Sequence, residues 1–281
     1  MKAPFLFPLD QLTSVDAAIA KPFIKWAGGK QAISSTLTNY FPDSYGKYFE
    51  PFIGGGSVFF STQPQDAVIG DLNTWLVDTY VAIRDSWEDV ATILDSMPNT
   101  KEDFLRVRSI APSGINSVQR AAHFIYLNKT CFRGLFRVNR KGQFNVPYGE
   151  YSRRYYSPEN LAAVSVALAK VEIRNGDYEL VMHDVSKDDF AYFDPPYYKI
   201  GGYSDFNRYT AGQFNKVDHM RLAAYCRELD RRSVKWALSN SNTDLVRKLY
   251  SGFNFKLISN RREINLNSKK RNIEELLITN Y

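Results

Sequence analysis

The stretch that most restricts the fold of this chain is Asp194-Pro195-Pro196-Tyr197, which directly follows the apolar run of residues 190–193. Prolines lack the N–H groups that a central strand needs, so a strand formed by the apolar run has to end at Asp194. Asp194 and the Pro195 carbonyl could each accept one hydrogen from a planar amino group while Tyr197 stacks on its ring. The alternative is an ordinary turn, since Asp and Pro are common turn formers.

Two upstream segments predict a ligand site beside this strand end. Gly28-Gly29-Lys30 closes an extended segment before an expected helix, and a loop that exposes N–H groups at a helix start can seat an anion. The run Tyr48 to Ser57, followed by the apolar residues 58–60, indicates a strand, a glycine turn and a helix, and Asp71 ends the next expected strand. An acid at that position grips ribose hydroxyls in doubly wound sheets. The Walker and dinucleotide fingerprints are absent, so the pattern favours a nucleoside-like cofactor; each element alone is equally compatible with a plain turn or helix cap.

The spacing of apolar and turn residues predicts an α/β fold. We expect helices at residues 31–41, 72–84, 87–97, 101–109, 117–128, 158–170, 213–232 and 243–250. We expect a first strand that begins at Tyr48 and ends before the glycine turn, and further strands at residues 67–70, 171–174, 189–193, 234–238, 253–258 and 273–278, the last two pairing across the loop at 261–271. This order predicts a Rossmann-like doubly wound sheet with an antiparallel C-terminal strand. The loop at 198–210 would cover the site.

An aromatic and basic stretch at residues 132–151 predicts a β-hairpin whose tip is Arg140-Lys141-Gly142. Arg pairs with guanine and Asn with adenine, so such a hairpin is suited to reading bases. The net charge of +6 is concentrated here: residues 129–154 hold seven bases against one acid, and residues 261–271 hold five against one. Both segments are typical of a phosphate-contacting surface, although a solvated basic face would show the same composition.

Several classes of protein are disfavoured. A hydrophobic content of 44% suits a packed core, and no apolar run approaches the length of a membrane span, so we expect a cytoplasmic protein without membrane partners. His123, His183 and His219 are scattered, and Cys131 and Cys226 have no metal-binding spacing, which predicts no metal site and no disulfide framework.

The motifs together resemble a known family, the Dam-type DNA adenine-N6 methyltransferases. The resemblance covers residues 21–281, and the order of cofactor motif, recognition region and catalytic motif is that of the α group. It is carried by Lys25 to Lys30, Glu50-Pro51-Phe52-x-Gly54-x-Gly56, Asp71-x-Asn73, Gly134-Leu135-x-Arg137-x-Asn139, Phe144 to Gly149, Asp194 to Tyr197 and Ser239-Asn240. It implies S-adenosylmethionine as methyl donor, double-stranded DNA as substrate, and an adenine flipped out of the helix.

The resemblance also implies roles for individual residues. The catalytic set is Asp194, Pro195, Pro196 and Tyr197. The cofactor-binding set is Trp26, Gly28, Lys30, Glu50, Phe52, Gly54, Gly56, Asp71, Asp177, Tyr178 and Asp194. The DNA-binding set is Lys25, Arg133, Leu135, Arg137, Asn139, Pro147 and Glu150.

The expected target is GATC, because Lys25, Leu135, Arg137 and Pro147 match positions that read it. Arg133 and Glu150 depart from the pattern, since GATC-specific members carry Asn and Arg there, so a different or relaxed site stays open.

The expected organisation is an N-terminal arm (1–20), a catalytic domain (21–85 and 171–281) and an inserted, mainly helical target-recognition domain with the hairpin (86–170). We expect a monomer or weak dimer. Alternatives are an RNA or protein methyltransferase, against which the basic hairpin argues, and a non-catalytic DNA-binding protein, which would not need Asp194-Pro195-Pro196-Tyr197 or Asp71.

Overall fold

The computed structural model describes residues 19–139, 142–152, 154–198, 214–261 and 272–281. The expected N-terminal arm falls almost entirely outside the described residues. So do the hairpin tip residues Arg140 and Lys141, most of the expected cover at 198–210, and most of the basic segment at 261–271.

Within the described residues, seven strands form one sheet in the order β3-β2-β1-β4-β5-β7-β6. The strands are β1 (Tyr48–Glu50), β2 (Ala67–Asp71), β3 (Glu172–Asn175), β4 (Phe190–Phe193), β5 (Lys235–Ser241), β6 (Asn254–Arg261) and β7 (Asn272–Thr279). Neighbours from β3 to β5 are parallel, whereas β7 runs antiparallel to both β5 and β6. The predicted α/β sheet with an antiparallel C-terminal strand is confirmed, as is the pairing of the last two strands.

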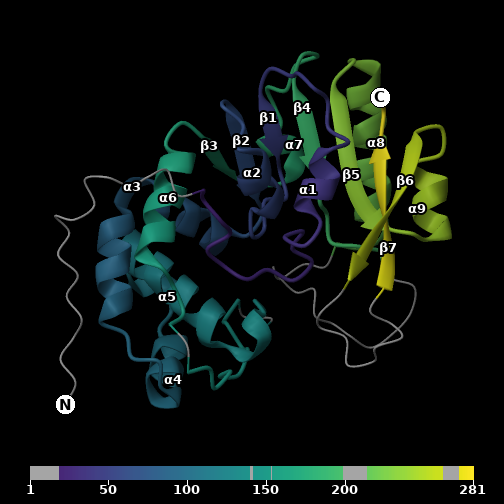
Figure 1. The fold of residues 1–281 in the computed structure, drawn as a ribbon. Helices are drawn as coiled ribbons and strands as arrows, with labels where there is room; N and C mark the ends of the chain where they lie inside the picture. The colour runs from purple at the N-terminus through teal and green to yellow at the C-terminus, as the bar shows by residue number, and fades with distance from the viewer. Residues whose placement is uncertain (1–18, 140–141, 153, 199–213, 262–271) are drawn as a thin grey trace.

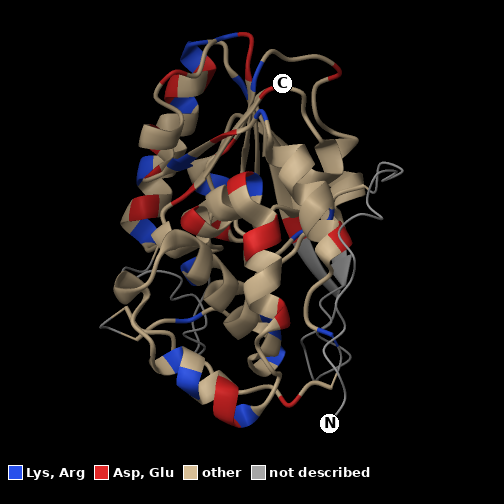
Figure 2. Ribbon diagram, turned by 90° about the vertical axis from the view of Figure 1, so that its left-hand side faces the viewer, with Lys and Arg blue, Asp and Glu red and all other residues tan. Residues whose placement is uncertain are grey.

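Helices cover both faces of the sheet. They are α1 (Ser34–Thr38), α2 (Ser57–Thr62), α3 (Thr74–Asp95), α4 (Lys101–Ser109), α5 (Ser117–Thr130), α6 (Pro158–Leu168), α7 (Tyr178–Val181), α8 (Lys216–Arg231) and α9 (Asp244–Leu249), with 3-10 turns η2 (Pro112–Gly114) and η3 (Phe132–Gly134). Figure 1 shows α3 to α6 gathered beyond the β3 end of the sheet, far from the β6 and β7 edge. On this side, the helices in Figure 2 carry interspersed acidic and basic residues.

Each central strand feeds two hydrophobic clusters because successive side chains point to opposite faces. Tyr48, Phe190 and Tyr192 belong to the first cluster, whereas the neighbouring Phe49 and Phe193 belong to the second. The second cluster lies under α7, α8 and α9. The first continues from α1 and α2 through α3 into the residues between β2 and β3, where it takes in Phe104, Phe124, Phe136 and Phe144.

The helices differ from the prediction in three places. The helix expected at residues 31–41 is only the five-residue α1. Residues 31–33 form turns, and Ile33, at the N-cap position, makes no side-chain cap. The helices expected at 72–84 and 87–97 form one continuous α3 with non-helical backbone at Ser86, so the expected break is a kink. The short α7 was not predicted, since four residues are too few for a periodicity; Asp177 begins it as an N-cap.

Candidate active site

Three carboxyl groups meet at one edge of the sheet. Strands β2, β1 and β4 are adjacent and parallel, so their carboxyl ends lie side by side. Glu50 ends β1, Asp71 ends β2, and Asp194 directly follows β4. In open α/β sheets this edge is where ligands bind. The structure therefore brings Asp194 to the same edge as Glu50 and Asp71, which precede it by more than a hundred residues in sequence.

Asp194 lies in a tight group with Lys30 and Tyr197. The Lys30 Nζ is 2.8 Å from Asp194 Oδ1 and donates to the Gly28 carbonyl at 2.6 Å. The same ammonium lies 4.6 Å from the centre of the Tyr197 ring. Lys30 is only 3% exposed, so this charge depends on Asp194 for its compensation. The expected anion seat at Lys30 is thus filled by a carboxylate of the chain itself.

Burial raises the pKa of Asp194 to about 6, with the charge of Lys30 and its hydrogen bond opposing the shift. At neutral pH the group is mainly an ionised acceptor. It is positioned at the mouth of the strand, where it can accept a hydrogen from a ligand amine. Such a group need not act as a general base if the ligand amine loses its proton only after its new bond has formed.

Glu50 behaves differently from Asp194 although both are buried. Burial raises the pKa of Glu50 to about 8, the hydrogen bond from the Tyr48 hydroxyl (2.7 Å) lowers it, and the charge of Asp194 raises it further. Glu50 is therefore mainly protonated at pH 7 and can donate a hydrogen bond. A neutral acid beside an ionised one avoids placing two like charges in one buried site.

Asp71 closes the glycine turn that follows β1. Its oxygens accept the N–H groups of Gly54 (3.2 Å) and Asn73 (2.9 Å), and burial raises its pKa to about 6. A carboxylate offers about four lone-pair sites, so capacity remains for hydroxyl donors such as those of a ribose. The free acceptor positions of Asp71 fit the nucleoside-like cofactor that the sequence predicts.

Packing explains why the turn needs glycine at position 54. Gly54 has a φ of +46°, and a Cβ added there would lie 2.6 Å from a ring carbon of Trp26. Trp26 in turn stacks on Phe136, with ring centres 5.6 Å apart. Trp26 therefore supports the turn from the side of residues 131–151. The φ of Gly56 is also positive, and a Cβ there would meet Phe60 and Tyr80 at 2.7 Å.

The remaining expected cofactor residues lie together at α7. The rings of Phe52 and Tyr178 have centres 5.6 Å apart. Asp177 accepts from the Glu179 N–H (3.1 Å) and from two nitrogens of Arg221 (2.9 and 3.1 Å). Arg221 also lies 5.0 Å over the Tyr178 ring. Asp177 is thus already bound to three donors, and Arg221, on α8, is a residue that the sequence did not single out.

The segments on either side of the expected hairpin tip pair antiparallel through isolated bridges. Antiparallel bridges join Cys131 to Tyr148 and Val138 to Phe144. Arg137 donates from Nε to the Asn145 side chain at 2.8 Å, which orients its guanidinium. The side chain of Asn139, by contrast, makes two bonds of 3.0 Å to Gln143. Its Nδ2 donates to Gln143 Oε1, and its Oδ1 accepts the Gln143 backbone N–H. Asn139 therefore stabilises the turn, whereas Arg137 is held ready at the side of the hairpin.

Arg133 and Glu150, the two residues that depart from the GATC pattern, share an unusual backbone. Their φ angles are +59° and +55°, a conformation that non-glycine residues rarely adopt. Arg133 is exposed; its N–H donates to the Tyr151 hydroxyl (2.9 Å) and its guanidinium lies 5.1 Å over the Phe132 ring. Pro147 is exposed and Leu135 half-buried. The expected DNA-binding residues other than Lys25 thus lie within one short region, residues 131–151.

Lys25 connects that region to the strand ends. Its backbone N–H and carbonyl both bond the side chain of Asn128, each at 2.8 Å. Its Nζ lies 5.0 Å over the Tyr151 ring, and a Cβ on Gly134 would approach Lys25 Cδ to 2.1 Å. Residues 25–30 thus run from the hairpin region to Asp194, with Lys25 at one end and Lys30 at the other.

Two further residues at the site were not predicted. Glu275 in β7 accepts the Tyr197 hydroxyl at 2.7 Å; its place directly before the apolar run of residues 276–278 was the available signal. Asn240 was named in the resemblance without a role. Its Oδ1 accepts the N–H groups of Tyr198 (3.3 Å) and Ser241 (2.8 Å). Its buried Nδ2 has no partner among the residues that the structure describes.

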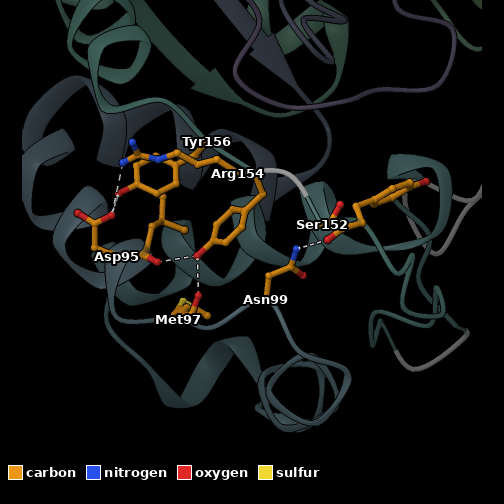
Figure 3. Close-up of a pocket in the computed structure, with 9 residues that line it drawn as sticks. Asp95, Met97, Asn99, Ser152, Arg154 and Tyr156 are labelled. Atoms are coloured by element: carbon orange, nitrogen blue, oxygen red, sulfur yellow. Dashed lines mark hydrogen bonds and ion pairs between the residues drawn. The ribbon is translucent and has the colours of Figure 1, made fainter. Parts of the chain in front are cut away.

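A surface pocket of about 310 Å³ lies elsewhere, between the end of α3 and residues 151–156 (Figure 3). Arg154 there pairs with Asp95, and the Tyr155 hydroxyl binds the carbonyls of Leu94 and Met97. None of the expected catalytic or cofactor residues lines it. The expected catalytic residues lie at the end of β4 instead.

The described residues contain neither a metal-binding cluster nor a membrane-spanning helix. No group of three or more His, Cys, Asp or Glu side chains is arranged to hold a metal ion. Among the same residues, no helix combines the length and apolar character needed to cross a membrane.

Comparison with known proteins adds a family match over most of the chain. The model of the D12 class of N6 adenine-specific DNA methyltransferases matches residues 26–264. This range contains every predicted cofactor, catalytic and DNA-binding residue except Lys25.

Curated relatives are similar over nearly the full chain. The type II methyltransferase M.MjaIII of Methanocaldococcus jannaschii is 40% identical over 93% of this chain and 99% of its own length. The type II methyltransferase M1.LlaDCHI of Lactococcus lactis subsp. cremoris is 38% identical over 93% and 95%. The DNA adenine methylase of Haemophilus influenzae is 27% identical over 92% of both chains.

Proposed function

The chain belongs to the D12 class of N6 adenine-specific DNA methyltransferases, and from this membership we propose that it methylates a flipped adenine in double-stranded DNA at the strand-end site. The observation that carries the proposal is the convergence of Lys30, Asp194 and Tyr197 at the end of β4, beside Glu50 and Asp71. The family is S-adenosylmethionine-dependent, and we propose that this chain uses the same cofactor.

We assign the cofactor to the ends of β1, β2 and β3. Asp71 would accept the ribose hydroxyls, and Phe52 and Tyr178 would line the adenine position. When bound, S-adenosylmethionine supplies an electrophilic methyl group on a sulfonium, with a good leaving group. In this site Asp194 is ionised and paired with Lys30, while Glu50 is neutral.

The protein's own contribution is orientation. Asp194 and the Pro195 carbonyl would accept the two hydrogens of the adenine amino group, which turns its lone pair away from the ring. Tyr197 would stack on the base. Holding the reacting atoms in line is worth up to about 7–11 kcal/mol in well-oriented systems, so a strong base is not needed. The methylated amino group would then release its extra proton to water.

We propose that residues 86–170 form the target-recognition domain and that residues 131–151 read the DNA. The support is that Arg137, Pro147, Leu135 and Arg133 lie in one hairpin region next to Lys25. GATC is the proposed target, because four of these positions match it. A different or relaxed target is the alternative, and it is favoured by Arg133 and Glu150.

The test is expression in a host that lacks adenine methylation, followed by genome-wide mapping of N6-methyladenine by single-molecule sequencing. Methylation confined to GATC is the expected result. Methylation at another sequence would keep the chemistry and transfer the specificity to Arg133 and Glu150. An absence of methylation with cofactor binding intact would favour an RNA substrate, which an assay on matched duplex DNA and RNA then decides.

A further inference from the structure

Glu275 is a buried acid that the proposed mechanism does not use. It lies in β7 opposite Ser241 of β5, with 5% of its surface exposed. Its Oε2 accepts the hydroxyl of Tyr197 at 2.7 Å. Its neighbours Leu276, Leu277 and Ile278 are all buried and apolar. A strand in this position would be satisfied by another apolar residue, and burying a carboxylate instead costs free energy.

The hydrogen bond to Glu275 restrains the Tyr197 ring at its hydroxyl end. A tyrosine ring has two side-chain torsions, and a bond at the hydroxyl restrains both. Lys30 lies over one face of the same ring at 4.6 Å. Tyr197 is thus held at its hydroxyl by β7 and over one face by the residue that pairs with Asp194. A ring restrained in this way presents a defined face to a stacking partner, and stacking depends on that orientation.

We propose that Glu275 is a positioning residue, which holds the Tyr197 ring in the orientation that stacks on the flipped adenine. The inference rests on the proposed function, since it assigns that stacking role to Tyr197. The charge of Glu275 reaches the reacting centre as well, because it contributes to raising the pKa of both Tyr197 and Asp194. Strand β7 thereby acts on the target side of the site through a single side chain.

The first experiment compares Glu275→Leu with Glu275→Gln in the full-length protein. Glu275→Leu removes the acceptor, and we expect kcat to fall about tenfold, as misplacement of a substrate-positioning group does. With 2-aminopurine at the target position of a DNA duplex, the fluorescence of the flipped base should change in the same variant. Binding of S-adenosylmethionine should stay within about twofold of wild type, because Glu275 contacts Tyr197 and not the β1 and β2 ends. Glu275→Gln retains an acceptor oxygen and should recover most of the lost turnover.

The second experiment tests whether the two residues act through one bond. Tyr197→Phe removes the donor and keeps the ring, so it should lower kcat as Glu275→Leu does. The double variant should then be no slower than the slower single variant. Fully multiplicative losses would show that Glu275 acts independently of Tyr197, and would overturn the proposal.

Thr279→Val is the matched control for β7. Thr279 lies four residues further along the same strand, about 13 Å away, and its hydroxyl donates to the Tyr281 carbonyl at 3.1 Å. An equal loss of kcat in Thr279→Val would mean that activity follows the stability of the strand. Glu275→Leu with wild-type kcat and fluorescence, or Glu275→Gln as slow as Glu275→Leu, would also overturn the inference. A wild-type protein that methylates no DNA would instead refute the proposed function.

Discussion

The strand-end site and the hairpin region hold their functional side chains by different means. At the strand ends, Asp71 ends β2 and Asp194 directly follows β4; backbone N–H groups hold Asp71, and the buried Lys30 holds Asp194. In residues 131–151, the backbone is joined by isolated bridges, and half-buried side chains such as Arg137 are oriented by local neighbours. The first arrangement fixes a geometry for chemistry. The second allows side chains to be exchanged while the scaffold stays, so we expect substitutions in the two regions to have effects of different kinds.

The largest effect is expected for Asp194→Ala. It removes the acceptor at the end of β4, and we expect turnover to fall by about a thousandfold or more. Transfer of a labelled methyl group to duplex DNA measures the loss. Since the variant leaves the buried Lys30 without its carboxylate, its melting temperature is recorded first. Asp184→Ala, which breaks a surface pair with Arg174, serves as control and should keep its turnover. Wild-type turnover in Asp194→Ala would remove this residue from the mechanism.

The next effect concerns pH and the cofactor. Burial raises the pKa of Asp71 to about 6, so its charged form, which accepts hydroxyls, is lost as pH falls through that value. We expect the affinity for S-adenosylmethionine to weaken below pH 6 by up to about tenfold per pH unit. Titration calorimetry between pH 5 and 8 measures this.

Asp194 has a pKa in the same range, so a variant is needed to separate the two acids. Asp71→Asn should bind the cofactor weakly at pH 7.5 and show a shallower dependence on pH. An unchanged slope in Asp71→Asn would assign the titration to Asp194.

In the hairpin region the expected effect is on selectivity. Arg137→Ala should cost about 1–3 kcal/mol at one base pair of the target, seen as a tenfold to hundredfold loss of kcat/KM on the cognate duplex relative to a duplex altered at that pair. Arg106→Ala removes the same charge from an exposed ion pair on α4 and should change both duplexes equally. If Arg137→Ala lost the same activity on both duplexes, Arg137 would contact phosphate and would not read a base.

The smallest effect is expected for Asn139→Ala. Its side chain is bonded to Gln143 within the turn, so the loss should be about 1 kcal/mol of stability, with site preference unchanged. Denaturant unfolding and the set of methylated sites measure the two quantities. A changed site preference would show that Asn139 leaves Gln143 and reads a base, and that the comparison between the regions underestimates this position.

Local sequence signals were sufficient for much of the fold and of the strand-end site. Prolines at 195 and 196 follow the end of β4, Pro51 and the glycines at 54–56 follow the end of β1, and these signals lie within a few residues of each strand. The ion pair of Lys30 with Asp194 was not predictable, because it joins segments 164 positions apart that only the order β2-β1-β4 brings together. Glu275 and Arg221 were missed for the same reason, since each acts on a residue from a different part of the chain.

In the hairpin region the pattern predicted the pairing but not the backbone. Positive φ angles are signalled by glycine, whereas here Arg133 and Glu150 adopt them. The role of Asn139 was also hidden, because an asparagine that reads a base and one that closes a turn look alike in sequence.

The continuity of the first hydrophobic cluster has a consequence for redesign and for descent. Because Phe104, Phe136 and Phe144 share that cluster with Tyr48, and Asn128 binds both backbone groups of Lys25, the hairpin cannot be exchanged as a cassette. If residues 131–151 read the DNA as proposed, we expect a chimera that exchanges them to need α5 and residues 21–30 as well. Lineages of such enzymes should then diversify by point changes at positions such as 133 and 150 rather than by shuffling.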